Sequence, residues 1–141
     1  MFAHDGSYEG FPACAETLWQ LWHGETDPTK KSYFKSRLDK FLDIFKRYSK
    51  LFPNGLPSYH RILCQYLWSQ QQTEAARQAI ARSEACAEQY EMIYEAALAQ
   101  AWRGRLRAGQ ERRDILQHAR TRLHALGAVV DVDHIASWGE A

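Results

Sequence analysis

The residues best suited to metal chemistry are a histidine and a cysteine four positions apart, His60 and Cys64. This spacing brings an imidazole and a thiolate to one face of a helix, where both could ligate a transition metal. No third or fourth ligand is spaced to complete the site, and His118 and His124 share a helix face poorly. We therefore expect a packed Cys64, a surface His60, and neither a metal nor another cofactor.

Patterns typical of catalysis are missing as well. Gly104 and Gly109 lie in or beside predicted helices, without the strand, glycine-rich loop and helix that cradle phosphates. No Ser-His-Asp or Cys-His arrangement is legible, and Cys86 fits a small apolar position in an alanine-rich helix. Because catalysis needs converging acids, bases or metals, we expect a protein that is not an enzyme.

Aromatic residues are more abundant than a small core requires, and several arginines accompany them. Trp, Tyr and Arg are the side chains that most often anchor protein interfaces. The candidates for binding a protein or peptide partner are Trp68, Tyr90, Arg103, Arg107 and Trp138. Packing between helices is the other interpretation of the tryptophans and tyrosines.

A second candidate surface is the basic face of the segment 30–50, which could bind nucleic acid or another anionic surface. Its candidate residues are Lys35, Arg37, Lys46, Arg47 and Lys50. We consider nucleic acid the weaker alternative, since the phenylalanines here follow the opposite, core-facing stripe and offer no stacking platform. A solvated face that is salt-bridged to the acidic N-terminal segment is expected instead. The acidic residues of that segment are Asp5, Glu9, Glu16, Glu25 and Asp27.

The elements that must position these residues are predicted to be helices. Apolar residues recur at steps of three and four, and Pro, Gly and polar turns separate the apolar stretches. The predicted helices cover about 11–23, 31–50, 58–71, 74–90, 92–107, 111–126 and 131–138, with a loose lead-in over 1–10. Thr73 is the expected N-cap of the fourth helix and Gly127 the C-cap of the sixth.

Length and composition fit one domain, residues 1–141. The chain is 45% hydrophobic, carries a net charge of +1 and holds three unevenly spaced cysteines. A disulfide framework is therefore not expected. No apolar run approaches the ~20 residues of a membrane span, and the N-terminus does not resemble a signal peptide. These features favour a cytoplasmic protein without membrane attachment.

The segments 58–93 and 94–129 are predicted to be two copies of a helical hairpin, offset by about 36 residues. An N-terminal helix pair over 11–57 precedes them, and a partial helix over 130–141 follows. Large side chains favour the first helix of each copy and small ones the second, which allows close packing. The expected fold is all-α: about seven helices whose antiparallel pairs stack as a short, right-handed, tetratricopeptide-like solenoid.

Several short motifs carry a family resemblance. They are Phe52-Pro53 with Pro57, Tyr94-Glu95-Ala96-Ala97, Arg113 through His118-Ala119, and Leu126-Gly127-Ala128. The chain resembles the tetratricopeptide-like C-terminal regions of large bacterial signalling ATPases, which are fused to cyclase, kinase or regulator modules. These motifs mark packing positions, so the resemblance implies an interaction scaffold and carries over no catalytic residue.

The predicted function is therefore a protein-interaction module, with a small-molecule sensor as a further alternative. The segment from Asp131 to Trp138 is too short to be a stable helix alone and must dock on its neighbours. Two outcomes are open. Trp138 folds back between the helices at 92–107 and 111–126 and caps the stack within one chain, or a second copy covers the exposed face and forms a symmetric dimer, which we slightly favour.

Overall fold

The computed structural model describes the backbone of residues 5–140 and the side chains of residues 10–139. Seven α-helices lie within this range: α1 (Asp5–Gly24), α2 (Pro28–Leu51), α3 (Leu56–Ser69), α4 (Thr73–Gln89), α5 (Ile93–Arg105), α6 (Gly109–Ala125) and α7 (Val129–Ala136). Two 3-10 helices, η1 (Pro53–Gly55) and η2 (Ser137–Glu140), follow α2 and α7. The prediction of an all-α chain is confirmed. None of the described helices has the length and apolar character required to span a bilayer.

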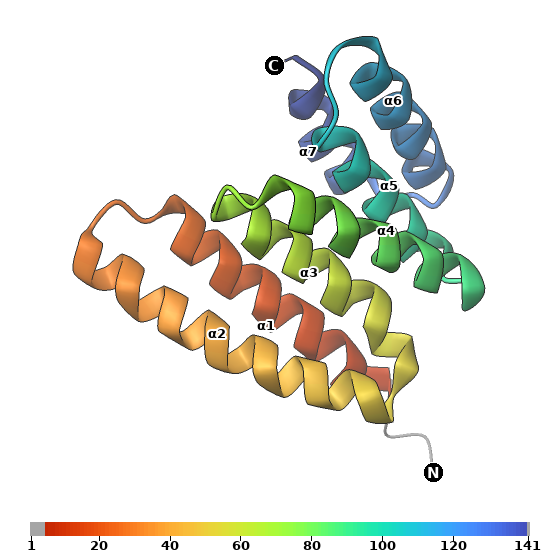
Figure 1. Cartoon of the computed structure of the whole chain (residues 1–141). Helices are drawn as coiled ribbons and strands as arrows, with labels where there is room; N and C mark the ends of the chain where they lie inside the picture. The colour runs from red at the N-terminus through yellow and green to blue at the C-terminus, as the bar shows by residue number, and fades with distance from the viewer. Residues whose placement is uncertain (1–4, 141) are drawn as a thin grey trace.

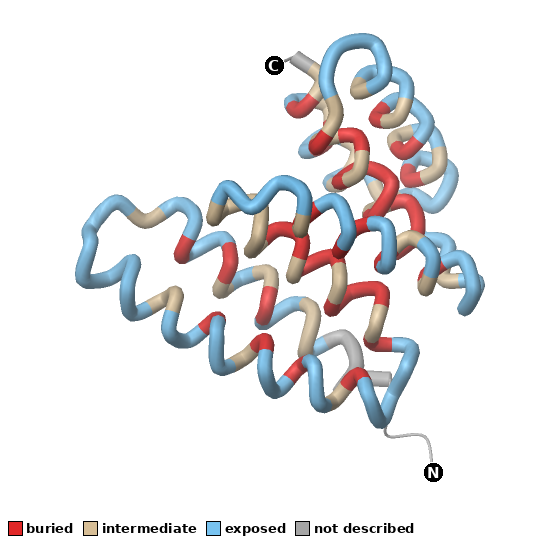
Figure 2. Tube along the Cα trace, in the orientation of Figure 1, coloured by how far each residue is buried: buried red, intermediate tan, exposed pale blue. Residues whose placement is uncertain are grey.

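Each helix packs against the next one in the chain, from α1 and α2 at one end of the molecule to α6 and α7 at the other (Figure 1). In addition, α1 contacts α3, and α3 contacts α5. In space α3 therefore lies next to both α1 and α5, although α2 and α4 come between them in the sequence. Buried positions concentrate on α3 and α5, whereas α2, α4 and α6 expose much of their outer surface (Figure 2).

The first two helices are longer than the sequence predicted. α1 begins at Asp5, so the expected loose lead-in is helical from that residue onward. α2 begins at Pro28 because Asp27 caps it: the Asp27 Oδ1 accepts the backbone N–H groups of Thr29 at 2.8 Å and Lys30 at 3.1 Å. A carboxylate here also interacts favourably with the positive end of the helix dipole.

The predicted cap of α4 is wrong. Thr73 is the first residue of the helix, and Gln72 occupies the cap position without a side-chain hydrogen bond. The turn before α4 contains Gln71, whose φ of 62° is left-handed. Because of this turn, the first residue of α4 is Thr73, one residue earlier than predicted from threonine as a capping residue. The last helix also begins earlier than expected, at Val129.

The ends of α4 and α6 have the same backbone geometry at positions about 36 residues apart. A left-handed residue follows each helix, Glu91 with φ 54° and Gly127 with φ 75°. The next N–H then donates to a carbonyl in the last helical turn, from Met92 to Ala87 at 2.8 Å and from Ala128 to Leu123 at 3.0 Å. This 6→1 hydrogen bond is the Schellman ending of a helix.

Small and branched side chains fill the contacts between α3, α4, α5 and α6. Three pairs of positions that are 36 residues apart, and so equivalent in the two segments, are buried: Ile80 with Leu116, Ser83 with Ala119, and Ala87 with Leu123. In α5, a Cβ on Gly104 would lie 2.9 Å from the Ile115 Cγ2 atom, so the absence of a side chain permits the close approach of α6. The buried Trp102 lies on α5, facing α1 and α3.

Candidate binding groove

A cavity of about 720 Å³ opens along one side of the molecule. Its lining comes mainly from α1, α3, α5 and α7, and lining residues occur along the whole of α5. These four are alternate helices of the chain. Apolar side chains make up part of the wall, including Leu98 on α5 and Ile135 on α7. The charged groups that line it are the carboxylates of Glu16, Glu95 and Asp131 and the guanidinium groups of Arg61 and Arg105. We call this hollow the groove.

A buried ion-pair network lies where the middle of α1 meets the N-terminal halves of α3 and α5. The Arg61 Nη1 lies 3.1 Å from the Glu16 Oε2, and the Arg61 Nε lies 3.2 Å from the Glu95 Oε2. Gln65 donates from Nε2 to the second oxygen of Glu16 at 3.1 Å. Burial disfavours the charge on Arg61, but the carboxylates of Glu95 and Glu16 outweigh it and raise the pKa above its ordinary value. Arg61 is therefore a fixed cation that joins three helices.

Negative charge exceeds positive charge at this end of the groove. Two carboxylates share the single guanidinium of Arg61, and Asp131 adds a third that accepts the Tyr94 hydroxyl at 2.9 Å. Burial and this hydrogen bond raise the pKa of Tyr94 to about 12, which keeps its hydroxyl a donor. The Oε1 of Gln65, a residue that is 1% exposed, has no hydrogen-bond partner within the described part of the chain. Carboxylates and an amide oxygen are acceptors, so this end suits a donor with a positive charge.

The other end of the groove is an aromatic cluster around Arg105. The guanidinium carbon of Arg105 lies 4.4 Å from the ring centroid of Trp68, 4.8 Å from that of Trp102 and 4.4 Å from that of Trp138. Trp19 meets Trp102 edge to face at 5.8 Å. Cation–π and aromatic contacts, each with a favourable geometry, tie together α1, α3, α5 and the 3-10 helix η2 here.

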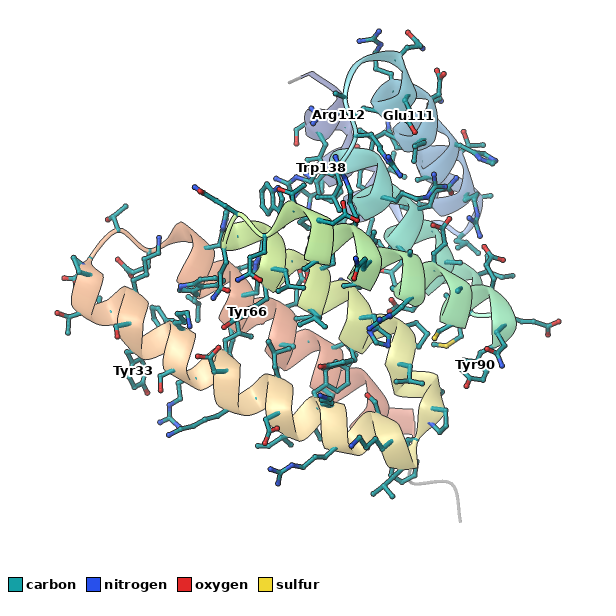
Figure 3. All side chains as sticks on the ribbon, viewed as in Figure 1. Tyr33, Tyr66, Tyr90, Glu111, Arg112 and Trp138 are labelled. Atoms are coloured by element: carbon teal, nitrogen blue, oxygen red, sulfur yellow. The ribbon has the colours of Figure 1, made fainter. Side chains whose placement is uncertain are left out.

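The structure separates the five predicted partner-binding residues. Trp68 and Trp138 meet around Arg105, and Trp138 is 9% exposed, so it is turned inward and is not an open anchor. Arg103 instead pairs with Glu84, from Nε at 2.8 Å, away from the groove lining. Tyr90 lies well away from Trp138 (Figure 3).

Arg107, the fifth of these residues, lies beyond the last turn of α5. Its side chain is 40% exposed, and its Nε lies 3.8 Å from a carboxylate oxygen of Glu111. It does not line the groove. The sequence could not separate Arg103, Arg105 and Arg107, because alternate positions of a helix point in different directions only once its orientation is known.

The predicted basic surface lies on α2, and its residues are largely engaged within the helix. Lys35 pairs with Asp39 at 3.2 Å, and Arg47 pairs with Asp43 at 2.7 Å. Arg37 stacks on Tyr33. Lys46 and Lys50 lie on the exposed face and have no ion pair among the described residues. This face is thus solvated and paired mainly with its own aspartates.

The expected pairing of α2 with acidic residues of the N-terminal segment is wrong where it can be seen. Glu16 pairs with Arg61 on α3, and Asp27 caps the backbone of α2. Glu25 accepts the neighbouring N–H of Asp27 at 3.0 Å. The side chains of Asp5 and Glu9 lie outside the described residues. Helical spacing allows i,i+4 pairs within α2, which are closer than any partner on α1.

His60 and Cys64 lie on α3, with Cys64 fully buried as expected. Burial raises the pKa of the Cys64 thiol to about 12, so it stays protonated and is a poor nucleophile. His60 is half-buried, not a free surface residue, and burial and Arg82 lower the pKa of its imidazole. No group of three or more His, Cys, Asp or Glu that could hold a metal occurs in the described part of the chain.

Sequence reasoning missed the polar residues that define the groove. Arg61, Gln65 and Glu95 are buried, and Glu16 is partly buried, although such side chains are normally assigned to a solvated face. One signal was available: Arg61 directly precedes the apolar pair Ile62-Leu63. Its partners lie 45 and 34 residues away, so only the packing of α1, α3 and α5 brings them together.

The chain matches no family model, and neither the curated proteins nor the solved structures include one with significant similarity to it.

Proposed function

We propose that this chain is a non-enzymatic helical-repeat module that binds a peptide segment of a partner protein in the groove. The proposal includes a right-handed solenoid in which antiparallel helix pairs stack, so that the first helix of each pair faces the groove. Support comes from the equivalent endings of α4 and α6 and from the groove lining, which α1, α3, α5 and α7 supply. The single observation that carries the proposal is this groove, with apolar walls and fixed charges.

The charges select the chemistry of the bound segment. Among the described residues, Glu16, Glu95 and Asp131 face a single cation, Arg61, at their end of the groove. A partner with a Lys or Arg side chain would complement this excess, while apolar residues beside it would cover Leu98 and Ile135. We therefore infer that the preferred ligand is a peptide whose basic residue is flanked by apolar residues.

A selection from a library of random displayed peptides tests this proposal. The account expects enrichment of peptides with Lys or Arg next to apolar residues, and affinities that fall as salt increases. Asp131→Asn should weaken the selected peptides at least about tenfold, the loss expected when a charge-assisted hydrogen bond disappears. Asp114→Asn is the matched control, since Asp114 is an exposed aspartate of α6 outside the groove.

Two results would reject the proposal. One is a library from which no binder can be selected. The other is a set of binders that Asp131→Asn and Asp114→Asn affect equally, which would place the interaction elsewhere on the molecule.

A further inference from the structure

Among the described residues, no hydrogen-bond acceptor faces the guanidinium of Arg105, unlike the guanidinium groups of Arg103 and Arg112. Arg103, two positions earlier on α5, donates to both oxygens of Glu84, at 2.8 and 3.2 Å. Arg112 donates to the backbone carbonyls of Arg105 and Arg107. No hydrogen bond or ion pair of the Arg105 side chain exists among the described residues. Its five N–H groups form a planar fork, and a desolvated cation of this kind normally finds an acceptor.

The tryptophans around Arg105 contact its charge through their ring faces and leave the edge of the guanidinium to another group. Trp68, Trp102 and Trp138 lie 4.4 to 4.8 Å from the guanidinium carbon, within the range at which a ring face attracts a cation. Ring faces cannot accept the in-plane N–H groups as a carboxylate does, so the guanidinium fork donates no hydrogen bond to the residues that the structure describes. Arg105 is only partly buried and lines the groove, so a group bound there can reach it.

The electrostatic surroundings favour an anion. Burial and the neighbouring cation Arg112 both lower the pKa of Arg105, and no carboxylate opposes them. The same positive charge, after burial, contributes to the lowered pKa of His23, which stacks on Trp19. This end of the groove is therefore positive, in contrast to the end at Glu16, Glu95 and Asp131.

We propose that Arg105 is a carboxylate-binding residue, which receives an acidic side chain or the terminal carboxylate of the bound peptide. A carboxylate matches the guanidinium fork with two parallel hydrogen bonds and carries the single charge that Arg105 can neutralise. A phosphate dianion would need a second free cation, whereas the guanidinium of Arg112 is already bound to backbone carbonyls. With a basic residue at the far end, this contact fixes the direction of the peptide. The inference rests on the proposed groove function.

NMR of the arginine Nε–H groups tests the site directly, with sodium acetate as the probe. The Arg105 signal is identified by its loss in Arg105→Lys, and the Arg103 signal, whose group is occupied by Glu84, is the internal control. We expect a saturable shift of the Arg105 signal with acetate and no such shift with chloride at equal ionic strength. In Arg105→Gln, the change in tryptophan emission on adding acetate should be lost, while Arg103→Gln should retain it. The two variants are compared only after their thermal unfolding shows that both are folded.

Three results would overturn the site. They are equal, non-saturating shifts with acetate and chloride, a response shared by Arg103, and inorganic phosphate that binds tenfold more tightly than acetate. Failure here is separable from failure of the groove. If selected peptides bind the groove but lose no affinity in Arg105→Gln, the peptide-binding function stands and the carboxylate site is rejected.

Discussion

At the scale of single residues, Arg61 on α3 links α1 and α5 through its two ion pairs at the groove. It lies between Glu16 and Glu95, and its side chain is 9% exposed. We expect Arg61→Ala to lower the free energy of unfolding by about 3–5 kcal/mol, because two carboxylates would lose their common partner in a poorly solvated place. Urea unfolding measures this loss. Arg47→Ala, which removes an exposed pair with Asp43, should cost no more than about 0.5 kcal/mol.

A value for Arg61→Ala as small as that of Arg47→Ala would contradict the assignment of Arg61 as the link between three helices. It would mean that water solvates Glu16 and Glu95 freely. The pH dependence of stability tests burial in α3 independently, through His60.

The half-buried His60 predicts how stability depends on pH. Burial, together with Arg82, lowers the pKa of the folded histidine below 6.5, its value in the unfolded chain. Between the two values the unfolded state binds more protons, so stability increases with pH there and is lost as the pH falls below about 6.5. We expect the melting temperature to decrease from pH 7 to pH 5.5, and His60→Gln to reduce that decrease. An identical pH profile in the variant would show that His60 is not the responsible group.

At the scale of elements, the spacing between α5 and α6 depends on one missing side chain. A Cβ at Gly104 would come within 2.9 Å of Ile115 and 3.1 Å of Leu116. Gly104→Leu should therefore destabilise the fold by about 1–3 kcal/mol through overpacking, measurable by thermal or urea unfolding. Gly24→Leu is the control, since no atom lies within 4 Å of a Cβ there. Equal effects at both glycines would mean that α6 moves away at no cost.

Helical periodicity was sufficient to predict most of the elements. The apolar stripe of α2, with Leu38, Leu42 and Phe45 buried, follows from local spacing alone. Helix boundaries were predicted less accurately. The sequence allows α2 to begin either after Asp27 or at Lys31, and only the hydrogen bonds of the Asp27 cap decide between them. Thr73 shows the converse: a good capping residue is not used when the preceding turn already orients the chain.

The groove itself could not be predicted from the sequence, for a physical reason. Its polar contacts join positions 34 to 50 residues apart, such as Arg61 with Glu95 and Trp19 with Ser69. No local pattern encodes such pairs, since they follow from the packing of helices that are not consecutive. Trp68 and Trp138 were singled out for their type, but Arg105, which brings them together, looked like one basic residue among several.

At the scale of the whole molecule, the C-terminal segment packs against its own chain. Ile135 is 2% exposed, and Trp138 lies 5.1 Å from Trp102, centroid to centroid. Deleting residues 131–141 should therefore lower the melting temperature, because Trp102 and Arg105 would lose their cover, while the number of chains per particle in solution stays the same. Light scattering and thermal unfolding measure both quantities. Conversion of a dimer to a monomer by this deletion would instead support the association of two copies through this segment.

Binding of a peptide in the groove can be seen by NMR of the labelled protein with a selected peptide. We expect the backbone amide shifts to cluster at groove residues such as Tyr94, Leu98 and Ala101 on α5. The signals of Lys46 and Lys50 on the outer face of α2 should stay unchanged. Shifts that concentrate on α2 and leave α5 unaffected would contradict the account and favour the basic face as the binding surface.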